Sequence, residues 1–247
     1  MNEIFSESTE ICDRAGAAHR HRVAIYGGSF DPLHRGHIAI ANAILSEFKL
    51  DEFVFIPAFH APHKVRLKPT SAYDRYAMLC LVTKKMSKVR VSKLEVDLPE
   101  RPYTVDTLRR LNTMRPKDEI FFVMGADSWM DIKTWREWET VLSLSNHIVV
   151  TRPGIELGTS HVTDEIRSRI VDLRRFPNAK PRSRKAAKEF FKDQRSKIKT
   201  QIFITDAVNL DISATSIRKK IRDADASWHE DVPAEVANYI EKYQIYK

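Results

Sequence analysis

The chain has 247 residues, 43% of them hydrophobic and 30% charged, which fits one sizeable α/β domain with or without an appendage. No apolar run approaches the roughly 18–20 residues of a transmembrane helix, residues 1–21 lack the pattern of a secretory signal, and the two cysteines, Cys12 and Cys80, do not suggest a disulfide framework. We therefore expect a polar tail over residues 1–21, one domain over residues 22–247, no membrane contact and a cytoplasmic location.

The net charge of +8 is concentrated in one part of the chain. Residues 164–200 contain 13 Lys and Arg against 5 Asp and Glu, so the remaining residues carry 28 charges of each sign. A basic segment of this kind could bind nucleic acid or an acidic partner, but no aromatic or motif pattern typical of nucleic-acid binding accompanies it. We interpret it as a solvated, partly disordered insertion and do not expect a nucleic-acid partner.

Short apolar runs alternate with helical patterns along the chain. In chain order these predict a strand at 21–28, a helix at 36–50, a strand at 51–59, a helix at 70–86, a strand within 89–98 and a helix at 103–114. A strand at 119–125, a helix at 134–145, strands at 147–154 and 201–205, and helices at 213–223 and about 233–243 follow. Strands that are continuous apolar runs favour a parallel sheet covered on both faces. We predict a Rossmann-like, doubly wound α/β fold in a single domain with a C-terminal helical part.

Ligands of such sheets bind at the carboxyl ends of the strands, near the point where the strand order reverses. Four polar stretches follow predicted strands there: GGSFDPLHRGH (27–37), PAFHAPHK (57–64), GADSW (125–129) and DISATSIR (211–218). We expect these stretches to surround one pocket.

The first of these stretches combines glycines with two histidines. Gly27 and Gly28 let a ligand approach the backbone closely, and Gly36 lies where the next helix exposes its N-terminal amides, a ready anion site. The spacing matches neither the G-x-G-x-x-G fingerprint nor a Walker loop. His34 and His37 would lie near the same helix end and donate hydrogen bonds to phosphate oxygens. This arrangement suits the stabilisation of charge on a transferring phosphoryl group rather than proton abstraction.

The histidines also allow a different interpretation. His34 and His37 form one His-x-x-His pair and His60 and His63 another, so together they could hold zinc. Proline and glycine flank both pairs and no cluster of carboxylates or cysteines accompanies them, so we do not predict a metal held by the protein. A further alternative, that loop histidines merely cap helices, fits His60 better than His34 and His37.

Two later stretches hold further polar candidates. Ser213 can cap the helix that follows it, with Ser216 and Arg218 in the first turns. This arrangement suits phosphate binding, and it equally suits an ordinary capped helix with a surface arginine. Asp127 follows a strand and could accept hydrogen bonds from ribose hydroxyls or an adenine amine.

Aromatic and basic residues complete the set of candidates. Trp135 and Trp138 lie three residues apart on the helix predicted at 134–145, and one of them could belong to the core. A partly exposed tryptophan near a pocket is suited to stacking on a heteroaromatic ring. His63 and Lys64 bring positive charge to the second stretch, where they could meet a phosphate or carboxylate of a second substrate.

Together these motifs resemble a known family. GGSFDPLHRGH is similar to the G-G-x-F-D-P-x-H-x-G-H signature of the HxGH-type nucleotidyltransferase superfamily, and ISATSIR is similar to its second phosphate-binding motif. With PHK (62–64), YTVDTL (103–108), GADSW, Trp135 and VTRPG (150–154), the chain resembles the bacterial nicotinate-nucleotide adenylyltransferases over about residues 22–155 and 201–245. The long N-terminal tail and the basic segment depart from this resemblance.

The resemblance implies that ATP and nicotinate mononucleotide give deamido-NAD and pyrophosphate, with Mg²⁺ accompanying ATP. The phosphate of the mononucleotide would attack the α-phosphorus of ATP without a general base, and catalysis would rest on positioning and charge stabilisation. The resemblance assigns ATP to Gly27, Gly28, Ser29, Phe30, His34, His37, Asp127, Ser213, Ser216 and Arg218, with His34, His37 and Arg218 as catalytic residues. It assigns the mononucleotide to Lys64, Thr104 and Trp135.

Other functions are compatible with parts of the sequence. KKMSKV (84–89) contains the Lys-Met-Ser-Lys string of class I aminoacyl-tRNA synthetases, but it follows the histidines too closely, and ISATSIR fills the place expected for it. An adenylyltransferase for nicotinamide mononucleotide or phosphopantetheine is a second alternative, although phosphopantetheine enzymes are typically shorter and lack GADSW and Trp135. A nucleotide- or RNA-binding protein that uses the basic segment is a third, against which the intact catalytic motifs argue. A homo-oligomer is compatible with the sequence, which does not determine the oligomeric state.

Overall fold

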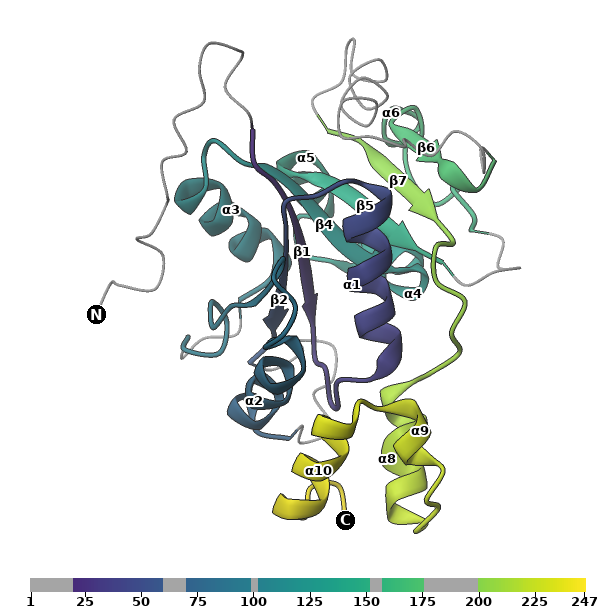
Figure 1. Ribbon diagram of the computed structural model, residues 1–247. Helices are drawn as coiled ribbons and strands as arrows, with labels where there is room; N and C mark the ends of the chain where they lie inside the picture. Colours follow the sequence, from purple (N-terminus) through teal and green to yellow (C-terminus); the bar gives the residue numbers. More distant parts are fainter. Residues whose placement is uncertain (1–19, 60–69, 99–101, 152–156, 176–199) are drawn as a thin grey trace.

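Seven parallel strands form one sheet within residues 20–59, 70–98, 102–151, 157–175 and 200–247, the parts of the chain that the computed structural model describes. The strands are β1 (Arg22–Gly28), β2 (Glu52–Pro57), β3 (Val89–Val91), β4 (Glu119–Gly125), β5 (Asn146–Val150), β6 (Ile170–Asp172) and β7 (Ile202–Thr205). They lie in the order β3–β2–β1–β4–β5–β7–β6, and Figure 1 labels all of them except β3. The predicted parallel α/β fold is confirmed.

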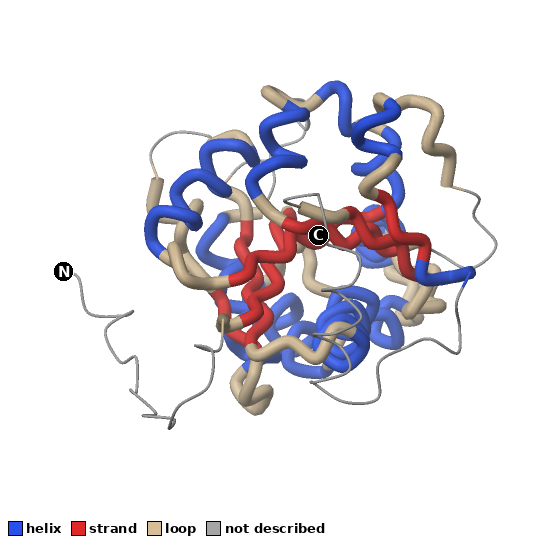
Figure 2. Tube along the Cα trace, turned by 90° about the horizontal axis from the view of Figure 1, so that it is seen from above, coloured by secondary structure: helices blue, strands red, loops and turns tan. Residues whose placement is uncertain are grey.

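Helices cover both faces of this sheet (Figure 2). One face carries α1 (Arg35–Glu47) and α2 (Ala72–Thr83), and α8 (Ala214–Arg222), α9 (Trp228–Asp231) and α10 (Ala234–Tyr243) continue its core beyond the carboxyl end of β1 (Figure 1). The opposite face carries α3 (Thr104–Met114), α4 (Ala126–Met130), the 3₁₀ turn η1 (Ile132–Thr134), α5 (Trp138–Leu144) and α6 (Asp164–Arg167). In the described parts of the chain, no helix is both long and apolar enough to span a bilayer.

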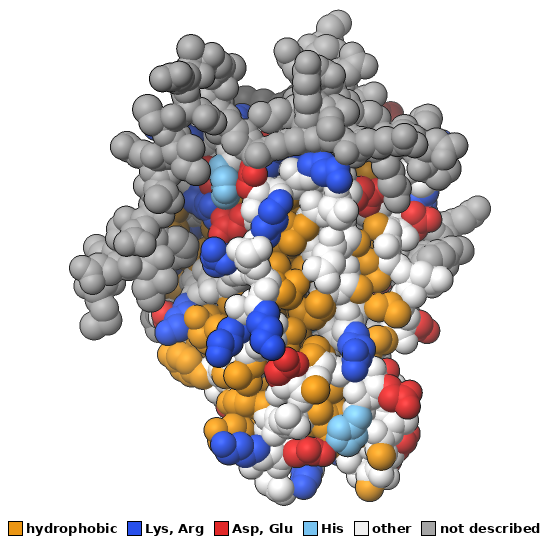
Figure 3. Space-filling model, in the orientation of Figure 1, with side chains coloured by type: hydrophobic (Ala, Val, Ile, Leu, Met, Phe, Trp, Pro, Cys, Tyr) orange, Lys and Arg blue, Asp and Glu red, His pale blue; other side chains and the backbone are white. Residues whose placement is uncertain are grey.

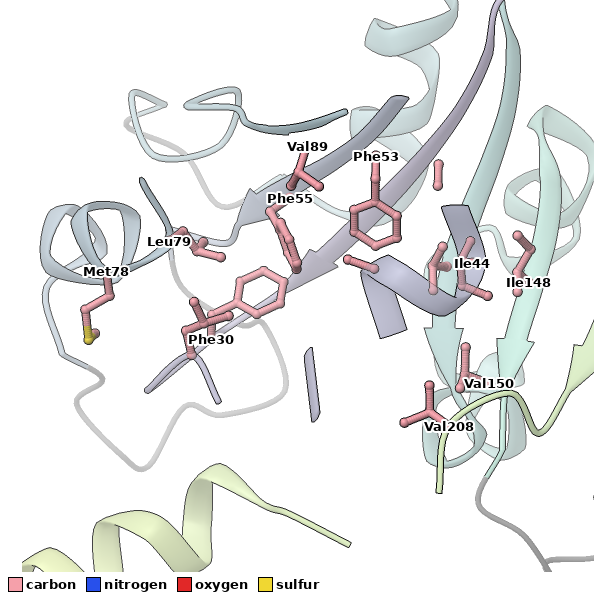
Figure 4. Close-up of a cluster of buried hydrophobic side chains, with 14 of the residues drawn as sticks. Phe30, Ile44, Phe53, Phe55, Met78, Leu79, Val89, Ile148, Val150 and Val208 are labelled. Atoms are coloured by element: carbon pink, nitrogen blue, oxygen red, sulfur yellow. The ribbon is translucent and has the colours of Figure 1, made fainter. Parts of the chain in front are cut away.

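Two apolar cores result, because successive side chains of a strand point to opposite faces of the sheet. In β1, Ala24 packs in the core under α1, whereas Ile25 packs in the core under α3 and α5. Phe53 and Phe55 of β2 are fully buried in the first core, where the Phe55 ring packs against both Phe53 and Phe30 (Figure 4). Burying an aromatic side chain of this size contributes about 1.5–3 kcal/mol. This aromatic cluster therefore anchors the loop that follows β1, which carries the GGSFDP motif.

The helix predicted at 134–145 is wrong in its first half. The turn η1 ends at Thr134, and α5 begins only at Trp138. Between them, Trp135 has an extended backbone (φ −77°, ψ 141°) and Glu137 a left-handed one (φ 50°), so the two pieces cannot form one helix. Trp135 therefore lies on the connection that precedes α5.

Part of the segment interpreted as a basic insertion belongs to the sheet. Residues 164–175 form α6, β6 and the 3₁₀ turn η2 (Leu173–Arg175), and β6 pairs with β7 at the sheet edge. No strand pattern is visible in the sequence here, because β6 has only three residues among charged neighbours. Residues 176–199 lie outside the described residues. On the face drawn in Figure 3, the described basic, acidic and apolar side chains are interspersed.

A buried histidine of β5 should make the stability of the fold depend on pH. His147 is fully buried, and burial together with the charge of Arg169 lowers its pKa from 6.5 to about 3. The unfolded chain takes up this proton near pH 6.5 and the folded chain does not, so stability is lost as the pH falls from about 6.5 towards 3. We expect His147→Leu to remove about 2–4 kcal/mol of this loss.

Urea unfolding at several pH values measures the effect. The matched control is His229→Leu, because the exposed His229 ring has a pKa raised by the Ala226 carbonyl and by Glu241. A raised pKa contributes stability at low pH, so the control should change the pH dependence in the opposite direction. If the free energy of unfolding changed with pH in the same way in the wild type and in His147→Leu, the prediction would be contradicted.

Candidate active site

The strand order reverses between β1 and β4, and a pocket lies at the carboxyl ends of these strands. The chain runs from β1 to β2 and β3 on one side and from β4 onward on the other, so the connections diverge here and leave a crevice. The pocket has a volume of about 210 Å³ and is lined by Ile25, Gly27, Gly28, Ser29, Ile56, Ala58, Glu95, Pro102, Tyr103, Thr104, Thr107, Phe122, Ser128, Trp135 and Arg136. Apolar walls with a few polar groups are typical of a small-molecule site.

Five residues predicted for the site line this pocket. They are Gly27, Gly28, Ser29, Thr104 and Trp135. Thr104 is the first residue of α3, and Trp135 lies on the connection before α5. The half-buried indole of Trp135 meets Phe122 edge-on, with ring centres 6.2 Å apart and an interplanar angle of 86°. This packing fixes Trp135 in the pocket wall, where a planar heteroaromatic ring could stack on it.

Within the protein, Gly28 is required by the close approach of the Phe30 ring, and the predicted approach of a ligand to the glycine pair stays a prediction. A Cβ atom at Gly28 would lie 2.9 Å from the ring of Phe30, whereas one at Gly27 would lie 3.8 Å from Phe122. Both glycines belong to β1, and the chain turns after them at Phe30, whose φ is 49°. This left-handed conformation costs a residue with a side chain about 1–2 kcal/mol, and the burial of the Phe30 ring offsets that cost.

The two histidines lie at the N-terminus of α1, as predicted. His34 is the N-cap residue and His37 the third residue of the helix. Their rings stack with centres 3.6 Å apart and an angle of 25° between the planes. The backbone N–H of His34 donates to Nδ1 of His37 at 3.2 Å, and the Phe30 ring packs edge-on against His37. The pair is therefore held rigidly beside the amides of the first helical turn.

The protonation state of His37 follows from these contacts. Its Nδ1 accepts a hydrogen bond and so carries no proton, and burial, together with the neighbouring His34, holds the pKa of His37 well below its usual range. The neutral ring then carries its proton on Nε2, which is a hydrogen-bond donor at neutral pH. A donor of this kind can stabilise charge on a phosphate and cannot abstract a proton through the same atom.

The packing of the His34 ring also explains why position 36, between the histidines, is a glycine. A Cβ atom here would lie 3.1 Å from two atoms of the His34 imidazole, so glycine lets this ring lie against the first turn of α1. The same position is 4.0 Å from Cβ of Ile212, which precedes α8. The start of α8 therefore adjoins the start of α1.

The second predicted phosphate motif lies beside the loop that carries the histidines. Ser213 is the N-cap of α8, and its Oγ accepts the backbone N–H of Ser216 at 3.1 Å, as the capping interpretation predicted. Arg218 donates to the carbonyl oxygen of Asp31 and to Oγ1 of Thr215 (3.3 Å). The Arg218 guanidinium thus links α8 to the loop between β1 and α1.

The predicted residues therefore form two groups that meet at the end of β1. The histidines and Arg218 lie on the side of α1 and α8, and Thr104 and Trp135 lie on the side of α3 and α5. Residues 27–30 join the two groups. Of the four polar stretches, the first three contribute lining residues, and the fourth reaches the pocket only through Arg218 and the histidine loop.

Other predicted residues lie elsewhere. Asp127 is exposed in the first turn of α4, and its neighbour Ser128 lines the pocket in its place. Lys64 lies outside the described residues, as do His60 and His63, so the four-histidine alternative is not tested.

The Lys-Met-Ser-Lys string has no place in this site. Residues 85–88 form turns in front of β3, and the backbone carbonyl of Lys88 accepts the N–H of Phe53 at the start of β2. They lie at the amino end of the strands, opposite the pocket. This position agrees with the sequence argument against the aminoacyl-tRNA synthetase alternative.

Sequence reasoning missed a buried arginine that holds the loops of the pocket. Arg75 of α2 is 1% exposed, and its guanidinium donates to the carbonyl oxygens of Ser29 (2.6 Å), Ala58 (2.7 Å), Phe59 (3.0 Å) and Thr70 (3.0 Å). Two of these residues line the pocket, so Arg75 ties the loop after β1 to the loop after β2. The sequence did contain a sign of this role, because Arg75 is a charged residue at a position where the helical pattern has apolar residues.

A second missed contact joins the C-terminus to the histidine loop. The hydroxyl of Tyr246 donates to Oδ1 of Asp31 at 2.6 Å, and the N–H of Thr70 donates to Oδ2 at 3.4 Å. Burial, and then the Asp31 carboxylate, raise the pKa of Tyr246, which therefore stays protonated as a donor. No local pattern could reveal a pair separated by 215 residues.

A third missed residue is a carboxyl group in the pocket wall. Oε1 of Glu95 accepts a hydrogen bond from the Thr107 hydroxyl at 2.7 Å. Burial raises the pKa of Glu95 to about 7, and this hydrogen bond acts in the opposite direction. The group therefore titrates near neutral pH at the edge of the pocket, a property that is typical of functional sites.

Comparisons with known proteins agree with this geometry. The model of the cytidylyltransferase-like family matches residues 25–220. A protein of Desulfitobacterium hafniense (strain Y51), named probable nicotinate-nucleotide adenylyltransferase, is 34% identical over 92% of this chain and 96% of its own. A protein of the same name from Thermoanaerobacter sp. (strain X514) is 33% identical over 92% of this chain and 94% of its own.

A solved structure supports the fold in the same way. The Plasmodium falciparum nicotinic acid mononucleotide adenylyltransferase complexed with NaAD superposes with a TM-score of 0.65 over 92% of this chain and 98% of that chain, at 21% sequence identity. At this identity, the likeness concerns the fold alone. The family, in contrast, follows from the sequence relatives and the family model, so this chain belongs to the nicotinate-nucleotide adenylyltransferases, within the cytidylyltransferase-like family.

Proposed function

We propose that this chain transfers the adenylyl group of ATP to nicotinate mononucleotide, giving deamido-NAD and pyrophosphate in NAD biosynthesis. The observation that carries this proposal is the meeting of two half-sites at the end of β1. A pocket with Thr104 and Trp135 adjoins residues 27–30 on one side, and the N-terminus of α1 with its histidines adjoins them on the other. Adenylyl transfer requires such a junction, because the phosphate of one nucleotide must meet the α-phosphate of the other.

The reaction consists of one displacement at phosphorus. A phosphate oxygen of the mononucleotide forms a bond to the α-phosphorus of ATP, and the bond from that phosphorus to the pyrophosphate oxygen breaks. A phosphate monoester is largely a dianion at neutral pH, with a second pKa near 6, so the nucleophile needs no general base. The protein then has to align the reactants, which can supply about 7–11 kcal/mol, and to stabilise charge on the departing pyrophosphate.

The proposed roles follow from the donors at each position. Nε2–H of His37, the His34 imidazole and the amides of the first turn of α1 would bind phosphate oxygens. Arg218 would supply positive charge to the triphosphate, with Ser213 and Ser216 at the start of α8 binding its outer part.

Residues in and beside the pocket would position the two nucleotides. Residues 27–30 would line the cleft shared by both, and the exposed Asp127 at the start of α4, which does not line the pocket, would contact ATP. Thr104, Trp135 and Lys64 would bind the mononucleotide, Trp135 by stacking on its pyridine ring.

Mg²⁺ is proposed to enter with ATP, bound mainly by phosphate oxygens and water, as Mg²⁺ usually is at phosphoryl-transfer sites. The described residues bring together no group of three His, Cys, Asp or Glu side chains, and the Asp31 carboxylate already accepts hydrogen bonds from Tyr246 and Thr70. The ion would offset negative charge on the phosphates. We also propose a cytoplasmic location, in keeping with the free thiol of Cys80.

A side-by-side assay tests the substrate. With ATP and Mg²⁺, the purified protein is expected to release pyrophosphate with nicotinate mononucleotide at a kcat/KM about tenfold or more above that with nicotinamide mononucleotide. Omitting the mononucleotide measures background hydrolysis of ATP. Equal or better use of the amide would show the choice of the acid to be wrong, and no turnover with either substrate would show adenylyl transfer to be wrong.

A further inference from the structure

Arg136 contributes the single positive charge among the described residues that line the pocket. It follows Trp135 on the short connection between η1 and α5. The left-handed backbone of Glu137 ends this connection. Trp135 and Arg136 therefore both precede α5, and both line the pocket. A cation thus adjoins the tryptophan that is proposed to stack on the pyridine ring.

The surroundings of Arg136 leave its donors available. Its guanidinium carbon lies 5.0 Å from the centre of the Tyr103 ring, a cation–π contact that holds the group over an exposed aromatic side chain. The nearest described carboxylate oxygen, Oε1 of Glu137, is 3.9 Å from Nε, which is beyond hydrogen-bond distance. Both oxygens of Glu137 instead accept hydrogen bonds from Arg109, at 2.5 and 3.3 Å. Among the described residues, no acceptor takes the N–H groups of Arg136.

Glu95, the second charged residue of the described pocket lining, is hydrogen-bonded to Thr107 rather than to Arg136. Glu95 accepts the Thr107 hydroxyl at 2.7 Å and belongs to the segment between β3 and α3. No ion pair between Glu95 and Arg136 occurs in the described structure. No carboxylate of the described pocket lining therefore pairs with Arg136, whose ion pair at 3.9 Å is with Glu137 outside the lining, so its N–H donors remain available to a ligand.

The two pyridine mononucleotides differ at one group that such a cation can distinguish. The acid carries a carboxylate, which can accept two parallel hydrogen bonds from a guanidinium. The amide offers one neutral oxygen, and its NH₂ group would face the N–H donors of the arginine. A hydrogen bond to a charged group contributes roughly twice as much as one between neutral groups, so the difference favours the acid.

We infer that Arg136 is a specificity residue that binds the carboxylate of nicotinate mononucleotide and so selects the acid over the amide. The inference rests on the proposed function, because it takes the stacking of the pyridine ring on Trp135 from there. It adds a residue that neither the motifs nor the predicted site contained.

Steady-state kinetics of Arg136→Gln with both mononucleotides test this inference. We expect kcat/KM for the acid to fall about 10- to 100-fold, mainly through KM, while kcat/KM for the amide stays within about twofold of the wild type. Arg136→Lys keeps the charge without the planar fork and should retain an intermediate preference. Lys133→Gln is the matched control, because Lys133 is an exposed cation of η1 that does not line the pocket.

The outcomes separate this inference from the proposed function. A wild type that prefers the acid, together with an Arg136→Gln variant that keeps the same preference, overturns the inference alone. Equal losses for both substrates also overturn it, because they indicate general damage to the pocket. A wild type that binds or uses no nicotinate mononucleotide overturns the proposed function, and the inference with it.

Discussion

Replacing Arg75 with methionine is expected to lower the free energy of unfolding by about 3–5 kcal/mol. The guanidinium is 1% exposed and donates to four backbone carbonyls in the loops after β1 and β2 and before α2. Methionine fills a similar volume but donates to none of them, so buried acceptors lose their partners, at roughly 1–3 kcal/mol each where water cannot replace them. Because Ser29 and Ala58 line the pocket, KM for the mononucleotide should also rise.

Urea unfolding followed by circular dichroism measures the first effect. Arg90→Met is a matched control, because among the described residues the Arg90 side chain donates only to the nearby carbonyls of Ser87 and Val89. We expect the control to lose less than about 1 kcal/mol. Arg75→Lys keeps the charge but has no planar fork, so its loss in the free energy of unfolding should lie between the losses of Arg75→Met and Arg90→Met. A loss below about 1 kcal/mol in Arg75→Met would show that the four bonds do not hold the loops.

Replacing His37 with alanine is expected to lower kcat about 10²- to 10³-fold with little change in KM. The ring is fixed by Phe30, by the stacked His34 ring and by the N–H of His34, so that its Nε2–H is preorganised as a donor. A donor that stabilises charge formed in the transition state acts on kcat more than on substrate binding.

Steady-state kinetics with saturating ATP test this prediction. His229→Ala is the control, because His229 pairs with Glu241 in the C-terminal helices and lies outside the site. His37→Gln should recover part of the rate, since the amide can accept the His34 N–H and donate to phosphate. A folded His37→Ala variant with kcat within threefold of the wild type would remove this residue from the mechanism.

The pH dependence of kcat gives a second check on the same histidine. Burial and His34 hold the pKa of His37 well below its usual range, so the ring is already neutral below pH 6.5. Raising the pH through 6.5 therefore removes no proton from His37, and kcat should not fall there on its account. A fall that disappears in His37→Gln would instead indicate that the protonated ring is required.

Much of the fold could be predicted from the sequence because its signals are local. Continuous apolar runs marked β1, β2, β4, β5 and β7, and the cap residue Ser213 marked where α8 begins. The histidines at the start of α1 and the pocket residues Thr104 and Trp135 followed from motifs that occupy short stretches at the strand ends. The edge strand β6 was missed because three residues carry no periodicity.

By itself, the sequence determined the parallel sheet, the helix starts at His34 and Ser213, and the family, since each depends on residues close together in the chain. Only the tertiary structure decided which distant groups meet: Arg75 with the loops of the pocket, Tyr246 with Asp31, and Arg136 with Tyr103. Hydrogen bonds and ring contacts of this kind depend on how elements pack, and they leave no periodic trace along the chain. The break before α5 likewise depends on the left-handed backbone of Glu137, which cannot be recognised within a run of helix-forming residues.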